Sequence, residues 1–277
     1  ATRDYSGRWI YEILQNIDDA IGPPDFEKFI GTKGLGFLSI LDIGHSPEVH
    51  SGPFHLGFSK SLLTKQLIEK GFNSAKAAEP PSLNVPFPAH PDAKTQDLLN
   101  QGFTTVIKLS TITDKHQDII DDLLTLKSDF LLFSQNLCTL SISYSNGKSR
   151  NFHKEVSPLE ADGPTSRSRI AISIEENEDE KPTTKEWIRW GREWQSDTNG
   201  GKRSSCMICL PYKNEQVVSR QDLYRVFNFY PTDQFIKINA VLHVTFNLSQ
   251  DRKRLQMWGD NTNWSSDRCN PENHRLI

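Results

Sequence analysis

A short helical pattern near the start of the chain, followed by a glycine-rich loop, most constrains what this sequence can fold into. Between residues 9 and 20, a turn of about 100° per residue places Glu12, Asn16 and Asp19 in one narrow sector of a helix. The apolar residues of the segment occupy the neighbouring sector: Trp9, Ile13, Ile17 and Ala20. The pattern therefore predicts a helix with a polar edge beside an apolar wall.

The polar edge carries residue types that suit magnesium and phosphate chemistry. A carboxylate such as Glu12 can accept a proton from an attacking water, and the side-chain oxygen of Asn16 is a hard ligand of the kind that magnesium prefers. Residues 31–37 read Gly-Thr-Lys-Gly-Leu-Gly-Phe, and such closely spaced glycines let backbone N–H groups approach phosphate oxygens. Taken alone, either element is explained more simply by a solvated helix face or an ordinary turn.

Together, the two segments resemble the signatures of the GHKL ATPase superfamily. Residues 12–20 read Glu-Ile-Leu-Gln-Asn-Ile-Asp-Asp-Ala and are similar to the family helix Glu-x-x-x-Asn-x-x-Asp-Ala. The form is closest to that of sacsin-type proteins, which are related to the ninety-kilodalton heat-shock chaperone. Residues 31–37 are similar to the family's second glycine box, Gly-x-x-Gly-x-Gly-Phe, and follow in the same order.

This resemblance implies ATP and Mg²⁺ as cofactors and a role for each matching residue. Glu12 would activate the attacking water, and Asn16 would hold magnesium. The other nucleotide-binding residues that the resemblance implies are Asp19, Ala20, Gly31, Lys33, Gly34, Leu35, Gly36 and Phe37.

Two later stretches extend the resemblance. Residues 102–109 predict a strand and are similar to the family's Gly-Thr strand, whose threonine lies under the nucleotide; Thr105 is the better match and Thr104 the second choice. Residues 246–255 resemble the catalytic loop of the chaperone middle domain, which sends an arginine to the γ-phosphate. Arg252 is the matching residue, although two additional residues precede it.

The sequence departs from the family between its two signatures. An Asp-x-Gly-x-Gly box, whose aspartate binds adenine, is expected there within a strand pair and a short helix. Only ten residues separate Ala20 from Gly31, and they would span only about 33 Å when fully extended. Either segments of a longer chain are missing here, which we favour, or this lineage has lost its adenine pocket.

Composition and charge limit the functional classes to which this protein can belong. Of the 277 residues, 36% are hydrophobic, which is enough to fill the core of one large domain or of two medium domains. No apolar run approaches the roughly 20 residues needed to span a membrane, and no signal peptide opens the chain, so we expect a cytoplasmic protein without a membrane partner. With a net charge of −3 and no basic stripe, nucleic-acid binding is not indicated.

Two other patterns are explained without a metal site. Cys206 and Cys209 have zinc-knuckle spacing, but they lie in a segment that predicts a buried strand, and no second ligand pair follows. They are therefore expected to be core cysteines. His45, His50 and His55 recur every five residues, and we expect them at the surface or in turns.

The order of the predicted elements indicates an α+β fold in two domains. Residues 1–155 would form a two-layer α/β sandwich, which the resemblance identifies as a Bergerat-type ATP-binding domain with segments missing between residues 20 and 31. Residues 156–277 would form an α/β transducer-like middle domain carrying the arginine loop. Trp187, Trp190 and Trp194 have helical spacing and predict a helix that packs them into the core or exposes them to a partner.

The function that the resemblance implies is ATP hydrolysis coupled to a change of shape. Because Arg252 would come from the second domain, hydrolysis would require the two domains to dock. A homodimer or larger assembly acting on a protein client would suit a chaperone-like ATPase. Two alternatives remain open: a regulatory ATPase module that controls an effector in an antiphage-defence or nuclease-linked system, and a scaffold whose nucleotide site has decayed.

Overall fold

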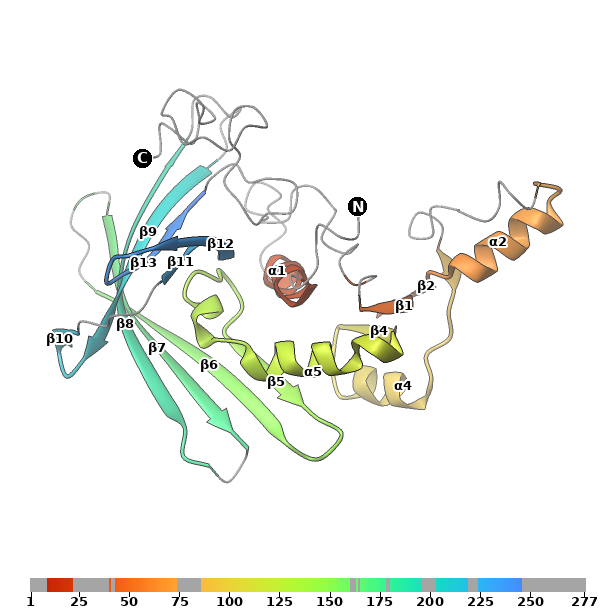
Figure 1. Cartoon of the computed structure of the whole chain (residues 1–277), viewed down its shortest axis with the longest axis horizontal. Helices are drawn as coiled ribbons and strands as arrows, with labels where there is room; N and C mark the ends of the chain where they lie inside the picture. Colours follow the sequence, from red (N-terminus) through yellow and green to blue (C-terminus); the bar gives the residue numbers. More distant parts are fainter. Residues whose placement is uncertain are drawn as a thin grey trace. The chain divides into compact units, whose positions relative to one another are not determined.

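A computed structural model describes residues 9–21, 40, 43–73, 86–159, 163, 165–177, 180–195, 203–218 and 224–245. These residues belong to two compact units (Figure 1). The first unit contains Trp9, Ile10 and the described residues from 40 to 124, and the second contains residues 11–21 and the described residues from 125 onward. The domain division at residue 155 stays a prediction.

The first unit is built on a four-stranded antiparallel sheet in the order β3-β2-β1-β4. The strands are β1 (Gly44–Ser51), β2 (Phe54–Gly57), β3 (Phe87–Pro88) and β4 (Thr105–Thr111). The helices of this part of the chain are α2 (Lys60–Glu69), α4 (Ala93–Asn100), η4 (Thr113–Lys115) and α5 (His116–Thr125).

Local sequence explains where the elements of the first unit begin and turn. Gly52 has a φ of 52° between β1 and β2, a conformation that glycine adopts without a Cβ penalty. The Ser59 hydroxyl accepts the Leu62 N–H, and the Asp92 carboxylate accepts the Thr95 N–H at 2.8 Å, so both residues act as helix N-caps.

The second unit is built on a nine-stranded sheet that curls like half of a barrel (Figure 1). Its order is β12-β11-β13-β9-β8-β7-β6-β5, with β10 paired to β9, and only the β11–β13 pair is parallel among the described strands. The strands are β5 (Thr139–Ser143), β6 (Ser149–Pro158), β7 (Thr165–Glu176), β8 (Thr183–Gln195), β9 (Arg203–Lys213), β10 (Gln216–Val217), β11 (Tyr224–Asn228), β12 (Tyr230–Ile236) and β13 (Val241–Val244). The unit also contains η5 (Ser128–Leu131) and most of α1 (Trp9–Ile21).

One face of the long strands forms the core of the second unit. Side chains alternate between the two faces of a strand, so Phe152, Ile170 and Trp187 lie on the same face of β6, β7 and β8, and all three are buried. The Phe130 ring of η5 packs edge-on against Phe152, with 5.6 Å between the ring centroids. The short segment around η5 therefore covers this face of the sheet.

The predicted fold class is wrong. The described residues are mostly β and form a curled sheet, not a two-layer α/β sandwich followed by an α/β transducer-like domain. The clearest error concerns the tryptophan segment, which is strand β8 and not a helix. Trp187 is buried on the core face, while Trp190 and Trp194 lie on the opposite face. A spacing of three then four residues suits a helix face, but here long antiparallel pairing with β7 and β9 determines the structure.

Several individual elements agree with the sequence patterns. The helix predicted near residue 12 is α1, the strand predicted at residues 102–109 corresponds to β4, and the strand predicted around Cys206 is β9. The apolar spacing of residues 116–133 is typical of one long helix, but α5 ends at Thr125 and is followed by η5. Strands β1 and β6 were not predicted, because neither shows clean alternation of apolar and polar residues.

Candidate functional site

The candidate site is the sector of α1 that carries the predicted cofactor-binding residues. Glu12 is only 1% exposed, whereas Asn16 and Ala20 are exposed and Asp19 is half-buried. The four residues follow one another along the same side of one helix. The accessible part of the sector therefore consists of a carboxamide and a carboxylate near the end of α1.

The packing face of α1 includes only part of the apolar wall that its sequence predicts, because Trp9 is buried but Ile17 and Ala20 are exposed. Leu14, Gln15 and Asp18 are buried, and Tyr11, one turn before Leu14, stacks at a tilt against Tyr230 with ring centroids 6.4 Å apart. Ile17, in contrast, is 37% exposed. The apolar residues beside Asn16 are consequently left accessible in the second half of the helix.

Asp18 explains why α1 packs on this face. Its fully buried carboxylate accepts the backbone N–H groups of Gln135, Asn136 and Leu137 at 2.8, 2.6 and 2.6 Å. The Asn136 side chain in turn donates to the Asp18 carbonyl at 3.0 Å. These hydrogen bonds from three consecutive amides to one carboxylate attach the helix to the segment that precedes β5.

The remaining predicted site residues lie either in the first unit or outside the described residues. Gly31, Lys33, Gly34, Leu35, Gly36, Phe37 and Arg252 lie outside the described residues. Thr105 begins β4 in the first unit, where it is exposed and its hydroxyl lies 2.9 Å from the Ser51 hydroxyl. Their roles stay predictions.

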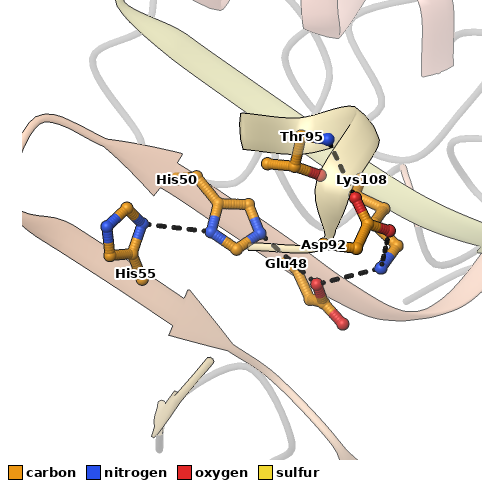
Figure 2. A network of polar contacts seen from close by, with 6 residues as sticks. All are labelled: Glu48, His50, His55, Asp92, Thr95 and Lys108. Atoms are coloured by element: carbon orange, nitrogen blue, oxygen red, sulfur yellow. Dashed lines mark hydrogen bonds and ion pairs between the residues drawn. The ribbon is translucent and has the colours of Figure 1, made fainter. Parts of the chain in front are cut away.

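A second group of polar side chains crosses the sheet of the first unit (Figure 2). His50 of β1 is fully buried, and its ring nitrogens lie 3.2 Å from His55 Nδ1 and 3.3 Å from Glu48 Oε2. Lys108 of β4 pairs with Glu48 at 3.3 Å and with Asp92 at 2.9 Å. The contacts thus connect β1, β2 and β4 with the beginning of α4.

The charged side chains of this group stabilise one another and have a structural role. The Thr95 backbone N–H and then the Lys108 ammonium hold the pKa of the Asp92 carboxyl well below its usual range. Asp92, and then Glu48, raise the pKa of Lys108. Both Asp92 and Lys108 are more than a third exposed, so solvent weakens their pair, and its main effect is to orient the start of α4.

The expectation that the three histidines lie at the surface or in turns is wrong for His50. The turn between β1 and β2 folds the chain back and places His50 directly opposite His55. Because two Nδ1 atoms face each other at 3.2 Å, one must carry the proton that the other accepts. The spacing of five residues could not reveal this pairing, since it depends on where the turn falls.

A buried serine–histidine contact in the second unit does not have the geometry of a catalytic dyad. His243 Nδ1 accepts the Phe229 backbone N–H at 2.9 Å, so the proton of the neutral ring resides on Nε2. Nε2 lies 2.9 Å from Ser205 Oγ and therefore donates to it. A ring that donates to the hydroxyl cannot remove its proton, and both residues are buried.

A buried lysine also occupies the second unit. Lys154 donates to the carbonyl and hydroxyl oxygens of Ser134 at 2.8 and 2.7 Å. Burial lowers the pKa of Lys154 to about 8, although Cys138 and Asp18 act in the opposite direction. Within the described part of the chain, the ammonium is therefore held in place by a neutral serine and not by a direct ion pair.

This lysine predicts a rise in stability with pH. Between about pH 8 and 10.5 the unfolded chain keeps a proton on Lys154 that the folded chain has lost, so raising the pH favours folding. From about pH 8 to 9.5, the free energy of unfolding of the wild type should increase by about 2 kcal/mol relative to Lys154→Met. Urea denaturation of both proteins at each pH measures this difference in the free energy of unfolding. A constant difference across this range would contradict the assignment, and Lys185→Met, which removes a lysine on β8, is the control.

Comparison with known proteins found no match: no family model, no curated protein and no solved structure is similar to this chain. The resemblance to the GHKL ATPases therefore stays a prediction. Within the described ranges, no helix is long and apolar enough to cross a membrane. Among the same residues, no cluster of three or more His, Cys, Asp or Glu side chains could hold a metal ion.

Proposed function

We propose that this protein binds Mg–ATP along α1, hydrolyses it and uses the bound nucleotide to switch conformation. The main support for the proposal is that one side of α1 is attached to the second unit while another side stays accessible. Asp18 and Leu14 attach the helix to the second unit, while Asn16 and its neighbours Ile17 and Ala20 stay accessible. A helix held firmly by one side can present the other side to a ligand.

The proposed roles follow from the chemistry of these side chains. The Asn16 carboxamide would bind Mg²⁺ through its oxygen, and Asp19 would contribute a carboxylate beside it. Ile17 would contact the apolar part of the nucleotide. Glu12 would activate water, Arg252 would stabilise charge on the γ-phosphate, and residues 31–37 would supply backbone N–H groups to the phosphates.

The proposal rests on these residues and not on the fold, because the described structure is not the sandwich that the resemblance implies. We further propose that the protein acts in the cytoplasm, as a homodimer or larger assembly with a protein client or effector. Domain docking through Arg252 would connect nucleotide state to those partners.

The burial of Glu12 favours a second candidate, a scaffold that binds nucleotide or a partner without hydrolysis. A general base must reach the water that it deprotonates, and Glu12 is 1% exposed. The absence of an Asp-x-Gly-x-Gly box between Ala20 and Gly31 points in the same direction. The two candidates differ in turnover and not necessarily in binding.

Magnesium-dependent ATP binding and turnover by the intact protein test the proposal. Asn16→Ala should weaken magnesium-dependent binding about tenfold or more, because it removes the proposed metal ligand. Glu12→Ala should preserve binding and lower turnover about a hundredfold or more. Asn100→Ala, which removes an exposed carboxamide from α4, is the matched control and should bind ATP like the wild type.

The possible results separate the candidates. Binding without turnover in the wild type would favour the non-hydrolysing scaffold. Absence of ATP binding by the intact protein would contradict the proposed ATPase and leave a scaffold that binds only a partner. Turnover that persists in Glu12→Ala would remove Glu12 from the mechanism.

A further inference from the structure

The outer face of the sheet in the second unit carries alternating arginines and aromatic rings. Direct cross-strand partners share a face of an antiparallel sheet, so Arg167 of β7 and Trp190 of β8 lie together, as do Arg169 and Ile188. Tyr212 of β9 joins this face opposite Glu186. The strands β7, β8 and β9 lie side by side in the middle of the sheet (Figure 1).

We define the arginine–aromatic patch as six residues of this face: Arg167, Arg169, Trp190, Arg192, Trp194 and Tyr212. Arg167 and Arg192 are exposed, the Arg169 side chain is 43% exposed, and the three rings are half-buried. The opposite face of the same strands is the buried core that contains Ile170 and Trp187. Packing into that core therefore does not account for the aromatic residues of the patch.

Two of the arginines lie over rings of the patch. The Arg167 guanidinium carbon lies 5.4 Å from the centroid of the Trp190 ring, and that of Arg169 lies 5.6 Å from the Tyr212 ring. Such stacking fixes the planes of the guanidinium groups and keeps their N–H donors available at the edges. Arg169 also pairs with Glu186, which is the carboxylate nearest to it on this face.

The charge of the patch is positive although the whole chain carries a net charge of −3. The patch contains three arginines and no carboxylate; Glu186 pairs with Arg169, and Glu215 is close enough to raise the pKa of Arg169 as well. On the same face, Glu155 of β6 lies opposite Ala171 in the middle of β7, and Glu175 lies at the end of β7 that is far from Arg167. An anionic partner would consequently be attracted to the end that contains Trp190, Arg192 and Trp194.

We propose that the arginine–aromatic patch binds single-stranded nucleic acid. Unpaired bases stack on aromatic rings and on guanidinium planes, while arginine N–H groups contact the phosphates between them. Trp190 and Trp194 lie four residues apart on the same face, about 13 Å along the strand, so they can contact different bases of one strand. A duplex hides the faces of its bases and would fit this surface less well.

Fluorescence anisotropy with a labelled oligothymidine strand and the intact protein tests the proposal. Trp190→Ala should weaken binding about tenfold, which corresponds to the loss of one stacked base. Arg167→Ala combined with Arg192→Ala should reduce the slope of log affinity against log salt by about 1.4, because two phosphate contacts are lost. Thermal unfolding of each variant confirms that it is folded.

An arginine–aromatic pair elsewhere provides the matched control. Arg225 lies over the Phe235 ring at 5.3 Å and is outside the patch, so Arg225→Ala should bind the oligonucleotide like the wild type. Absence of binding at low salt, or equal weakening by Arg225→Ala, would overturn the proposal. Tighter binding to a duplex of the same length, or to polyglutamate, would overturn it as well and assign the patch to a duplex or to an acidic protein.

Discussion

Replacing Asp18 with alanine should destabilise the second unit by about 3 to 5 kcal/mol, because three backbone N–H groups lose one shared carboxylate acceptor. All three amides, those of Gln135, Asn136 and Leu137, lie in the segment that Asp18 ties to α1. Each buried donor left without a partner costs about 1–3 kcal/mol. Urea denaturation gives the loss of stability, and hydrogen exchange reports on the three amides directly.

The neighbouring carboxylate supplies the control for this experiment. Asp19 is half-buried, so Asp19→Ala should cost much less than Asp18→Ala. Asp18→Asn should fall between the two, since the amide keeps one acceptor oxygen but turns a donor toward the same N–H groups. If Asp18→Ala and Asp19→Ala were equally stable, the proposed attachment of α1 would be wrong.

Acidification should destabilise the second unit through His243. The ring is fully buried, and burial lowers its pKa to about 3 from an ordinary value of 6.5. Between these values the unfolded chain binds a proton that the folded chain does not, so stability is fully present above about pH 6.5 and falls as the pH decreases toward 3. From about pH 7 to 4.5, the free energy of unfolding should fall by about 3 kcal/mol.

The hydrogen bonds of His243 also indicate that protonation of the ring lowers stability. Protonation would place a hydrogen on Nδ1, which now accepts the Phe229 N–H, and would turn that contact into two opposed donors. His243→Gln should show a loss of stability with acid that is smaller by about 3 kcal/mol over the same range. His153→Gln, which removes an exposed imidazole, is the control and should retain the wild-type dependence.

Nuclear magnetic resonance provides an independent measurement. The His243 imidazole should not titrate between about pH 5 and 8 in the folded protein. An imidazole signal assigned to His243 that titrates near its ordinary pKa would contradict the buried geometry, whatever the stability data show.

The sequence alone located several elements because their signals are local. The 3.6-residue period predicted α1, and the continuous apolar run around Cys206 predicted β9. The Asn146–Gly147 dipeptide between β5 and β6 is another local signal, typical of a turn, and Gly147 has the positive φ of 82° that such a turn favours. None of these features requires knowledge of a distant partner.

The fold class could not be predicted because it depends on which strands pair. The three tryptophans of β8 suit a helix by spacing, yet hydrogen bonds to β7 and β9 along nearly its whole length make the segment a strand. Pairing also separates Trp187 from Trp190, sending one to the core and the other to the arginine–aromatic patch. Local propensity is weaker than such long-range pairing.

The sequence by itself determined the polar sector of α1, since helical geometry alone aligns Glu12, Asn16 and Asp19. Only the tertiary structure decided which side of that helix is buried and which stays open. Asp18 is the deciding residue, because its carboxylate satisfies three amides that lie more than a hundred residues away. Satisfying buried hydrogen-bond donors through Asp18, together with burying Leu14, sets the orientation of α1.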